Sequence, residues 1–189
     1  MEKVMIARIL CLIVLLLEII GLSISFKERK WKVLFFYTQL SNMITAVSAL
    51  LLLVFGDRGW VVPLRYLSTS MLVMTFLVTV CVLIPMGGDP HKLLWSGNGL
   101  FHHVLCPVIS TVSYLLFEKA AGRRWIWLPV LVTLAYGLVM LYLNAKGIFD
   151  GPYPFFRVRN QSVQATVLWM VILTIVITVI SAIVMALSR

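Results

Sequence analysis

Charged residues are scarce in this sequence of 189 residues. They make up 12% of the chain, whereas soluble domains carry roughly 25%. Hydrophobic residues make up 61%, and a soluble core of this size could not bury so much apolar surface. The composition therefore excludes a soluble enzyme and a disordered tail, and it indicates an integral membrane protein.

Cysteine is also rare, and its positions exclude a disulfide scaffold. Cys11, Cys81 and Cys106 all lie inside apolar stretches, and no C-x-x-C pair occurs. Cysteines in such a setting behave as small hydrophobic residues rather than as a redox-dependent framework. We expect all three to be buried.

Metal- and haem-binding patterns are missing. The only histidines are His91, in a loop beside Asp89, and the adjacent pair His102 and His103. One helix cannot direct two adjacent imidazoles at a single ion, and bis-histidine haem ligation normally needs histidines on facing helices. We expect no metal and no cofactor.

The apolar residues gather in six stretches. Each stretch is long enough to cross a hydrocarbon core, which takes about 17 to 25 helical residues, and none shows the alternation of a membrane strand. The sequence therefore predicts an all-α fold in which residues 1–189 form one domain. This domain is a bundle of six transmembrane helices over residues 9–26, 33–55, 66–86, 99–117, 126–145 and 163–187.

The first stretch could be a signal peptide, because Lys3 and Arg8 precede it. Glu18 interrupts the apolar run, however, and no A-x-A cleavage pattern follows. We expect this stretch to be retained as a helix. The net charge of +9 does not indicate nucleic-acid binding, because the basic residues lie at the ends of the stretches, where they suit anionic lipid headgroups. The 16 Lys and Arg residues divide evenly between the two sides, so the positive-inside rule predicts no orientation.

Polar side chains inside the stretches are the informative residues, because an unpaired polar group in hydrocarbon is costly. Thr38, Ser41, Asn42 and Thr45 have the spacing i, i+3, i+4 and i+7, which places them on one helix face. Such a face is consistent with hydrogen bonds between helices, in which hydroxyls also bond back to their own backbone. The alternative is the wall of a functional cavity.

The fourth stretch carries a second polar cluster. Asn98 and His102 share a face, and His103 points roughly 100° away. Pro107 leaves a carbonyl near His103 without its helical partner, which loosens the helix there. The histidines could be anchors at the membrane border or parts of a site.

Two further features have a structural and a functional interpretation. Glu18 lies midway along the first stretch, so its carboxylate is paired, protonated or exposed to water. It could relay protons or make a structural hydrogen bond. The loop 147–162 contains Gly151-Pro152-Tyr153-Pro154-Phe155-Phe156, which is typical of an aromatic belt at the membrane interface.

These groups permit nucleophilic catalysis. A threonine hydroxyl needs a base to remove its proton, and a neutral imidazole is the side chain best suited to this near pH 7. If the second and fourth helices face each other, Thr38 and His102 would form a nucleophile–base pair. Ser41, Asn42 or Asn98 could then donate hydrogen bonds to the developing oxyanion. The substrate would be an acyl ester that enters sideways from the bilayer.

Three segments resemble the androgen-induced and androgen-dependent TFPI-regulating protein family. They are the run Trp31-Lys32-Val33-Leu34-Phe35-Phe36-Tyr37-Thr38, the pattern Asn98-x-x-x-His102-x-x-x-x-Pro107, and Tyr153-Pro154-Phe155. Bacterial relatives are six-helix proteins with similar F-[FY]-T-x-x-S-N and H-x-x-x-P patterns. The resemblance implies a membrane threonine hydrolase that cleaves fatty acid esters of hydroxy fatty acids. A bacterial member would lie in the inner membrane.

Carried over to this sequence, the resemblance implies that Thr38 is the nucleophile and that His102 is the base. The bacterial spacing of histidine four residues before proline selects His103 instead, and we favour His102 because of the longer spacing from Asn98. The loop departs from the family, since Phe156-Arg157 follows where relatives tend to have an acidic residue. The expected partners are a lipid ester and membrane lipids, and no nucleic acid. A channel or transporter and a structural membrane subunit are the alternatives to an esterase.

Overall fold

The all-α fold predicted from the sequence is confirmed by the structure, a computed structural model that describes residues 2–188. The described residues form six long helices and no strand. The helices are α1 (Glu2–Arg29), α2 (Tyr37–Phe55), α3 (Val61–Val78), α4 (Cys106–Phe117), α5 (Leu128–Ala145) and α6 (Val163–Leu187). Three-residue and longer turns of 3₁₀- and π-helix extend or connect them.

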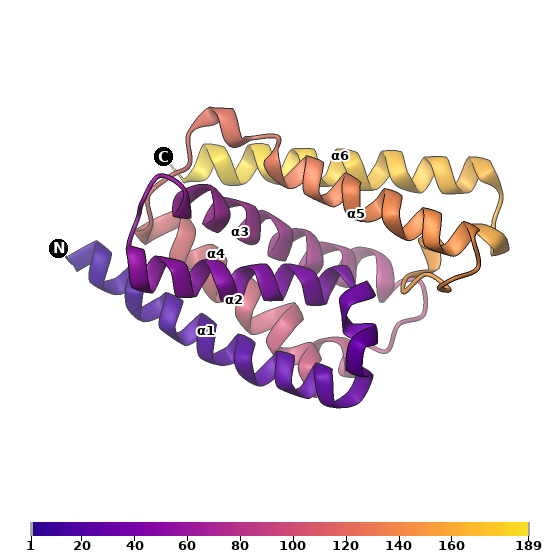
Figure 1. The fold of residues 1–189 in the computed structure, drawn as a ribbon, viewed down its shortest axis with the longest axis horizontal. Coiled ribbons are helices and arrows are strands. Elements are labelled where there is room, and N and C mark those ends of the chain that lie inside the picture. Colours follow the sequence, from indigo (N-terminus) through magenta and orange to yellow (C-terminus); the bar gives the residue numbers. More distant parts are fainter. Residues whose placement is uncertain (1, 189) are drawn as a thin grey trace.

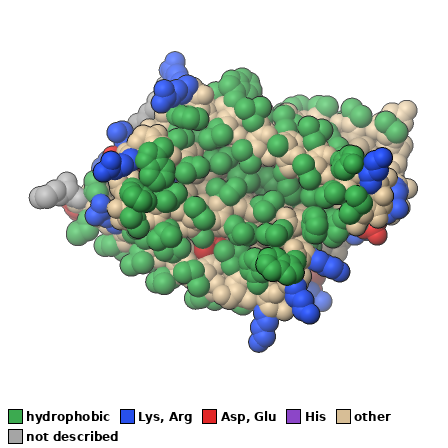
Figure 2. Space-filling view, viewed as in Figure 1, with side chains coloured by type: hydrophobic (Ala, Val, Ile, Leu, Met, Phe, Trp, Pro, Cys, Tyr) green, Lys and Arg blue, Asp and Glu red, His purple; other side chains and the backbone are tan. Residues whose placement is uncertain are grey.

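All six helical segments are long and apolar enough to cross a membrane. Their outward faces carry large apolar side chains, such as Leu16, Leu138 and Ile175, each more than half exposed. Figure 2 shows apolar side chains over the middle of one face and Lys and Arg side chains toward its two ends. This distribution fits a multi-pass integral membrane protein, because lipid solvates the apolar band and headgroups pair with the cations.

The predicted spans are close to the observed ones, with three corrections. Helix α1 begins at Glu2 and ends at Arg29, whereas the prediction was 9–26. Residues 33–35 belong to the 3₁₀-helix Lys30–Phe35 that follows α1, so α2 begins at Tyr37 rather than at Val33. The third helix begins at Val61, five residues earlier than predicted, and continues as a π-helical turn over Thr79–Leu83. Because the helix starts earlier, Arg65 lies in a buried part of α3, whereas it was expected in the preceding loop.

The helix α3 lies at the centre of the bundle (Figure 1). It contacts α2 and α4 on one side and α5 and α6 on the other, while α1 packs against α2 and α4. Helix α1 begins and α6 ends at the same end of the bundle (Figure 1), as an even number of spans requires. The central position explains why α3 has the most buried residues of the six helices.

The contact between α1 and the segment before α4 depends on Gly21. A Cβ atom at Gly21 would lie 2.4 Å from His102 Nε2 and 2.9 Å from Phe101 Cβ. Only a residue without a side chain allows the imidazole to press against the backbone of α1. Small residues allow close approach of membrane helices in the same way.

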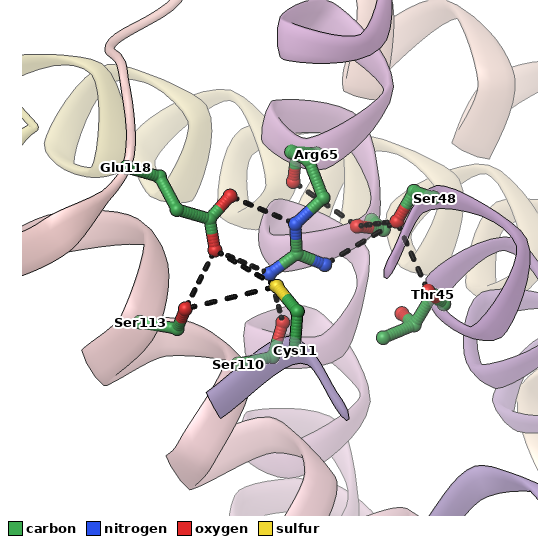
Figure 3. A network of polar contacts seen from close by, with 8 residues as sticks. Cys11, Thr45, Ser48, Arg65, Ser110, Ser113 and Glu118 are labelled. Carbon is green, nitrogen blue, oxygen red and sulfur yellow. Dashed lines mark hydrogen bonds and ion pairs between the residues drawn. The ribbon is translucent and has the colours of Figure 1, made fainter. Parts of the chain in front are cut away.

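A buried ion pair joins α3 to the end of α4 (Figure 3). Arg65 donates from Nε to Glu118 Oε2 at 2.8 Å and from Nη2 to Glu118 Oε1 at 2.7 Å, and both side chains are 1% exposed. The guanidinium also donates to Ser48 of α2 and Ser110 of α4, at 3.3 and 3.2 Å. Cys11 of α1 lies 3.5 Å from Glu118 Oε1. One charged pair therefore connects four helices.

Replacing Gly21 by alanine is expected to destabilise the bundle. The added methyl group forces α1 away from His102, and overpacking of this kind costs typically about 1–3 kcal/mol. Thermal unfolding of the purified protein in detergent measures the loss. Gly59→Ala is the matched control, since a Cβ atom there meets nothing within 4 Å. Equal melting temperatures for the two variants would contradict the close contact.

Replacing Glu118 by alanine is expected to cost about 3–5 kcal/mol of folding free energy, because the Arg65 guanidinium is left buried without a counterion. The double variant Arg65→Met, Glu118→Leu removes both charges and should recover most of the loss. Thermal melts of the single and double variants test this. A double variant as unstable as Glu118→Ala would show that the charges are not coupled.

Candidate functional site

Thr38 lies in the first turn of α2, where backbone N–H groups have no partner within the helix. Two tyrosine hydroxyls take the place of the missing carbonyls. Tyr136 Oη of α5 accepts from the Tyr37 N–H at 3.1 Å, and Tyr153 Oη accepts from the Thr38 N–H at 3.2 Å. The N-terminus of α2 is thus fixed in the interior by residues far away in the sequence.

Tyr153 also contacts the side chain of the threonine. Its Oη lies 3.2 Å from Thr38 Oγ1, and either atom could donate. Because Tyr153 Oη already accepts from the Thr38 N–H, its own proton is available for Thr38 Oγ1. Burial raises the pKa of Tyr153, partly offset by the hydrogen bonds with Thr38. The phenol therefore keeps its proton at neutral pH and remains a donor.

The position of Tyr153 corrects the interpretation of the loop 147–162. Tyr153, Phe155 and Phe156 are all buried, at 7%, 4% and 4% exposed, so they do not form an aromatic belt at the interface. Their rings pack on one another and on Trp169 of α6 and Tyr136 of α5. The two prolines of the segment fix a turn that inserts these rings between the helices.

His103 lies on the other side of Thr38. Its Nε2 is 3.4 Å from Thr38 Oγ1, and its Nδ1 is 2.6 Å from the carbonyl oxygen of Leu93. A carbonyl only accepts, so Nδ1 carries the proton and the Nε2 lone pair faces the threonine hydroxyl. Gly99 makes this possible, because a Cβ there would lie 2.6 Å from the carbonyl oxygens of Lys92 and Leu93.

The helix around the histidines is loosened, as Pro107 predicts. Residues Leu100–Leu105 wind as a π-helix, and the N–H of Cys106 bonds to the carbonyl of Phe101. Short π-helical turns inside α-helices frequently occur at functional sites. The turn places His102 and His103 against two different neighbours, α1 and α2.

The predicted pairing of Thr38 with His102 is wrong, because His103 occupies that position. His102 is fully buried against Gly21, and its Nε2 lies 3.6 Å from Glu18 Oε2 of α1. Neither imidazole nitrogen of His102 and neither oxygen of Glu18 has a hydrogen-bond partner within residues 2–188. Adjacent residues on a helix face different directions. His102 therefore packs against α1 at Gly21, while His103 faces Thr38.

Two of the three expected oxyanion donors are also directed elsewhere. Ser41 donates to the Thr38 carbonyl at 2.9 Å and contacts Thr75 at 3.0 Å, and Asn42 donates to the Thr38 carbonyl at 2.6 Å. Both side chains are fully buried behind the threonine. Asn98 does line the cavity beside Thr38, but its amide donates to Ser25 at 2.9 Å.

Gln39 and Tyr153 are the site residues to which the sequence analysis gave no role in the site. Gln39 is 2% exposed, lines the cavity beside Thr38, and its Oε1 has no partner among the described residues. The sequence pattern that could have identified Gln39 is a long polar side chain next to Thr38 in an otherwise apolar helix. Tyr153 was noted in a family-like segment, but its contact with Thr38 was not predicted, because an aromatic residue between prolines is also typical of a membrane-interface loop.

Thr38 and Tyr153 line two cavities at once. One is an apolar cavity of about 50 Å³ between α2, α3, α5 and α6, with walls that include Met74, Leu134 and Met170. The other, of about 400 Å³, opens toward the loops, and its lining includes the polar residues Gln39 and His103. The hydroxyl of Thr38 thus lies between a hydrocarbon-like compartment and a compartment open to water.

The three free cysteines do not belong to this site. Cys11 and Cys106 are buried, as expected, whereas Cys81 is exposed. Within residues 2–188, no three His, Cys, Asp or Glu side chains are grouped closely enough to hold a metal ion. The contacts of the Thr38 hydroxyl with the His103 imidazole and the Tyr153 phenol are of a kind that permits proton transfer.

No protein-family model matches the chain, and neither does any curated protein or solved structure.

Replacing Tyr153 by phenylalanine is expected to lower the free energy of unfolding by about 1–3 kcal/mol, because the buried N–H of Thr38 loses its acceptor. Tyr142→Phe is the matched control, since Tyr142 is 59% exposed. Thermal unfolding in detergent compares the two. Equal stability of the two variants would show that the hydroxyl of Tyr153 does not cap α2.

Proposed function

We propose that this protein is an intramembrane hydrolase of lipid esters in which Thr38 is the nucleophile and His103 is the base. The observation that carries the proposal is the chain of contacts from Thr38 Oγ1 to His103 Nε2 and from His103 Nδ1 to the Leu93 carbonyl. A nucleophile, a base and a group that orients the base are the parts of a catalytic triad.

The distance of 3.4 Å between Thr38 Oγ1 and His103 Nε2 suits a resting enzyme. Catalytic hydrogen bonds are often long without substrate and shorten in the complex. The tautomer is already the required one, because the Leu93 carbonyl holds the proton on Nδ1. His103 can therefore take the threonine proton without first rearranging its own.

The oxyanion would form next to two sources of positive potential. The phenol of Tyr153 can donate a hydrogen bond, and the N-terminus of α2 carries the positive end of the helix dipole. Donors fixed in place before the reaction stabilise a developing oxyanion without reorganisation.

The reaction would proceed in two steps. Thr38 Oγ attacks the ester carbonyl carbon as its proton passes to His103 Nε2. The bond between the carbonyl carbon and the alcohol oxygen then breaks, and His103 returns the proton to the leaving alcohol. Water from the polar cavity attacks the acyl-threonine, with His103 again as base, which releases the fatty acid and restores Thr38.

The two cavities and the sequence resemblance together support the substrate class. The apolar cavity between α2, α3, α5 and α6 supports an acyl chain by the character of its lining, since small-molecule pockets are mostly apolar with a few placed polar groups. The segments that resemble the androgen-induced and androgen-dependent TFPI-regulating protein family include Thr38 and Tyr153, and the H-x-x-x-P spacing of the bacterial relatives selects His103. We therefore propose fatty acid esters of hydroxy fatty acids, or similar esters, as substrates.

The pair of adjacent histidines provides a matched test. His103→Gln is expected to lower kcat by about 10²-fold or more, since general-base catalysis contributes about 10² to 10⁴, and Thr38→Ala should abolish formation of the acyl-enzyme. His102→Gln should keep kcat within a few-fold, because His102 faces Glu18 instead of Thr38. Turnover of a hydroxy-fatty-acid ester by the purified protein measures all three.

Two results would contradict the proposal. Loss of turnover in His102→Gln with normal turnover in His103→Gln would make His102 the base. Wild-type protein that neither hydrolyses such an ester nor reacts with a fluorophosphonate probe at Thr38 would be a non-enzymatic membrane protein. Melting temperatures of the variants separate loss of catalysis from loss of folding.

A further inference from the structure

A groove runs along the outer side of α5 and α6, which lie side by side (Figure 1). This α5–α6 groove has a volume of about 340 Å³, and its lining includes Leu141 of α5 and Val167, Val171 and Ile175 of α6. These three residues of α6 are each at least 49% exposed, and within residues 2–188 no charged side chain lines the groove. The groove therefore faces the hydrocarbon of the bilayer, where acyl chains are the groups available to fill it.

The hydroxyl groups in the α5–α6 groove are already paired within the chain. Thr166 donates to the carbonyl oxygen of Ser162 at 3.2 Å, and Thr174 donates to that of Met170 at 2.6 Å. Hydroxyls that bond back to their own helix need no partner from a ligand. A molecule in this groove therefore needs only hydrocarbon to match the lining.

Met170 separates the α5–α6 groove from the apolar cavity beside Thr38. Met170 and Thr174 line both spaces. Gly137 of α5 lies opposite the methionine, since a Cβ atom at Gly137 would lie 2.9 Å from Met170 Cε. The end of the methionine side chain thus fills the gap that a glycine leaves between the two helices. Because methionine is unbranched and flexible, it can leave this gap by rotation about its own bonds.

The apolar cavity is too small for a long acyl chain while Met170 lies in this gap. Its volume of about 50 Å³ holds about four water-sized groups, at roughly 10–15 Å³ each. Displacement of Met170 would join this volume to the groove of about 340 Å³. The joined space would extend from Thr38 to the bilayer.

We propose that Met170 closes a lateral entrance between α5 and α6, through which an acyl chain passes from the bilayer into the apolar cavity. This proposal rests on the proposed esterase function and gives its substrate a route. The chain displaces the end of Met170 from Gly137 and then lies partly in the apolar cavity and partly in the α5–α6 groove. The cavity that opens toward the loops remains free for water.

Photolabelling tests the route without any turnover. A fatty acid with a diazirine at the end of its chain is added to the full-length protein in phosphatidylcholine nanodiscs, and mass spectrometry identifies the labelled residues. Labels are expected on Met74 and Leu173, which line the apolar cavity and are 3% and 8% exposed. Met170→Ala should raise this labelling several-fold and Met170→Trp should lower it, because the indole overpacks the gap at Gly137. A general loss of folding would not produce opposite effects in the two variants.

The length of the acyl chain tests the same route during turnover. A butyryl ester is short enough for the apolar cavity of about 50 Å³, whereas an oleoyl ester of the same alcohol is not. In Met170→Trp, kcat/KM for the oleoyl ester is expected to fall about tenfold or more relative to the butyryl ester. Leu168→Trp is the matched control, since Leu168 is 59% exposed on α6 and lines neither the cavity nor the groove.

The two measurements separate the entrance from the esterase function. Labelling of Met74 that is absent, or that is equal in wild type, Met170→Ala and Met170→Trp, would overturn the entrance, whatever the turnover. An equal fall in kcat/KM for both esters, or the same chain-length effect in Leu168→Trp, would also overturn it. Labelling that depends on Met170 in a protein that hydrolyses neither ester would overturn the esterase and retain the entrance as part of a lipid-binding site.

Discussion

The hydrocarbon core of a bilayer supplies no hydrogen bonds, and this constraint determines where most polar side chains of the protein lie. A polar group inside the bundle must find a partner on its own helix or on a neighbour. Thr45 and Thr79 use the first solution, since each hydroxyl donates to the carbonyl four residues earlier. Arg65 and Glu118 use the second, and the pair is stable inside because serines of two helices complete its hydrogen bonds.

The same constraint separates the structural polar groups from the candidate site. Ser41, Asn42 and Ser48 make hydrogen bonds that hold helices together. At the end of the bundle near the loop 147–162, the partners are a tyrosine hydroxyl and an imidazole, both able to exchange protons with Thr38. The unpartnered oxygen of Gln39 lies at the same place. The groups able to react thus lie next to those that only hold the fold.

The number and type of helices could be predicted from the sequence, because an apolar run of about 20 residues has one stable structure in lipid. Thr38 could also be found, since a polar stripe on an apolar helix is conspicuous. The choice between His102 and His103 could not, because it depends on how closely α1 approaches at Gly21. Arg65 escaped notice because a cation near a span boundary is usually in the headgroup region. The buried position of Tyr153 is a consequence of packing between α2, α5 and α6, which no local pattern contains.

The π-helical turn Leu100–Leu105 has a consequence for how the site could change. Such a turn contains one residue more than an α-helical turn, so it is equivalent to a single insertion in the helix. Removing one residue between His103 and Pro107 would restore regular winding. It would also place His102 four positions before the proline, in the register where His103 now stands. The π-helical turn, together with the approach of α1 at Gly21, therefore sets which of two neighbouring imidazoles lies beside the hydroxyl of α2.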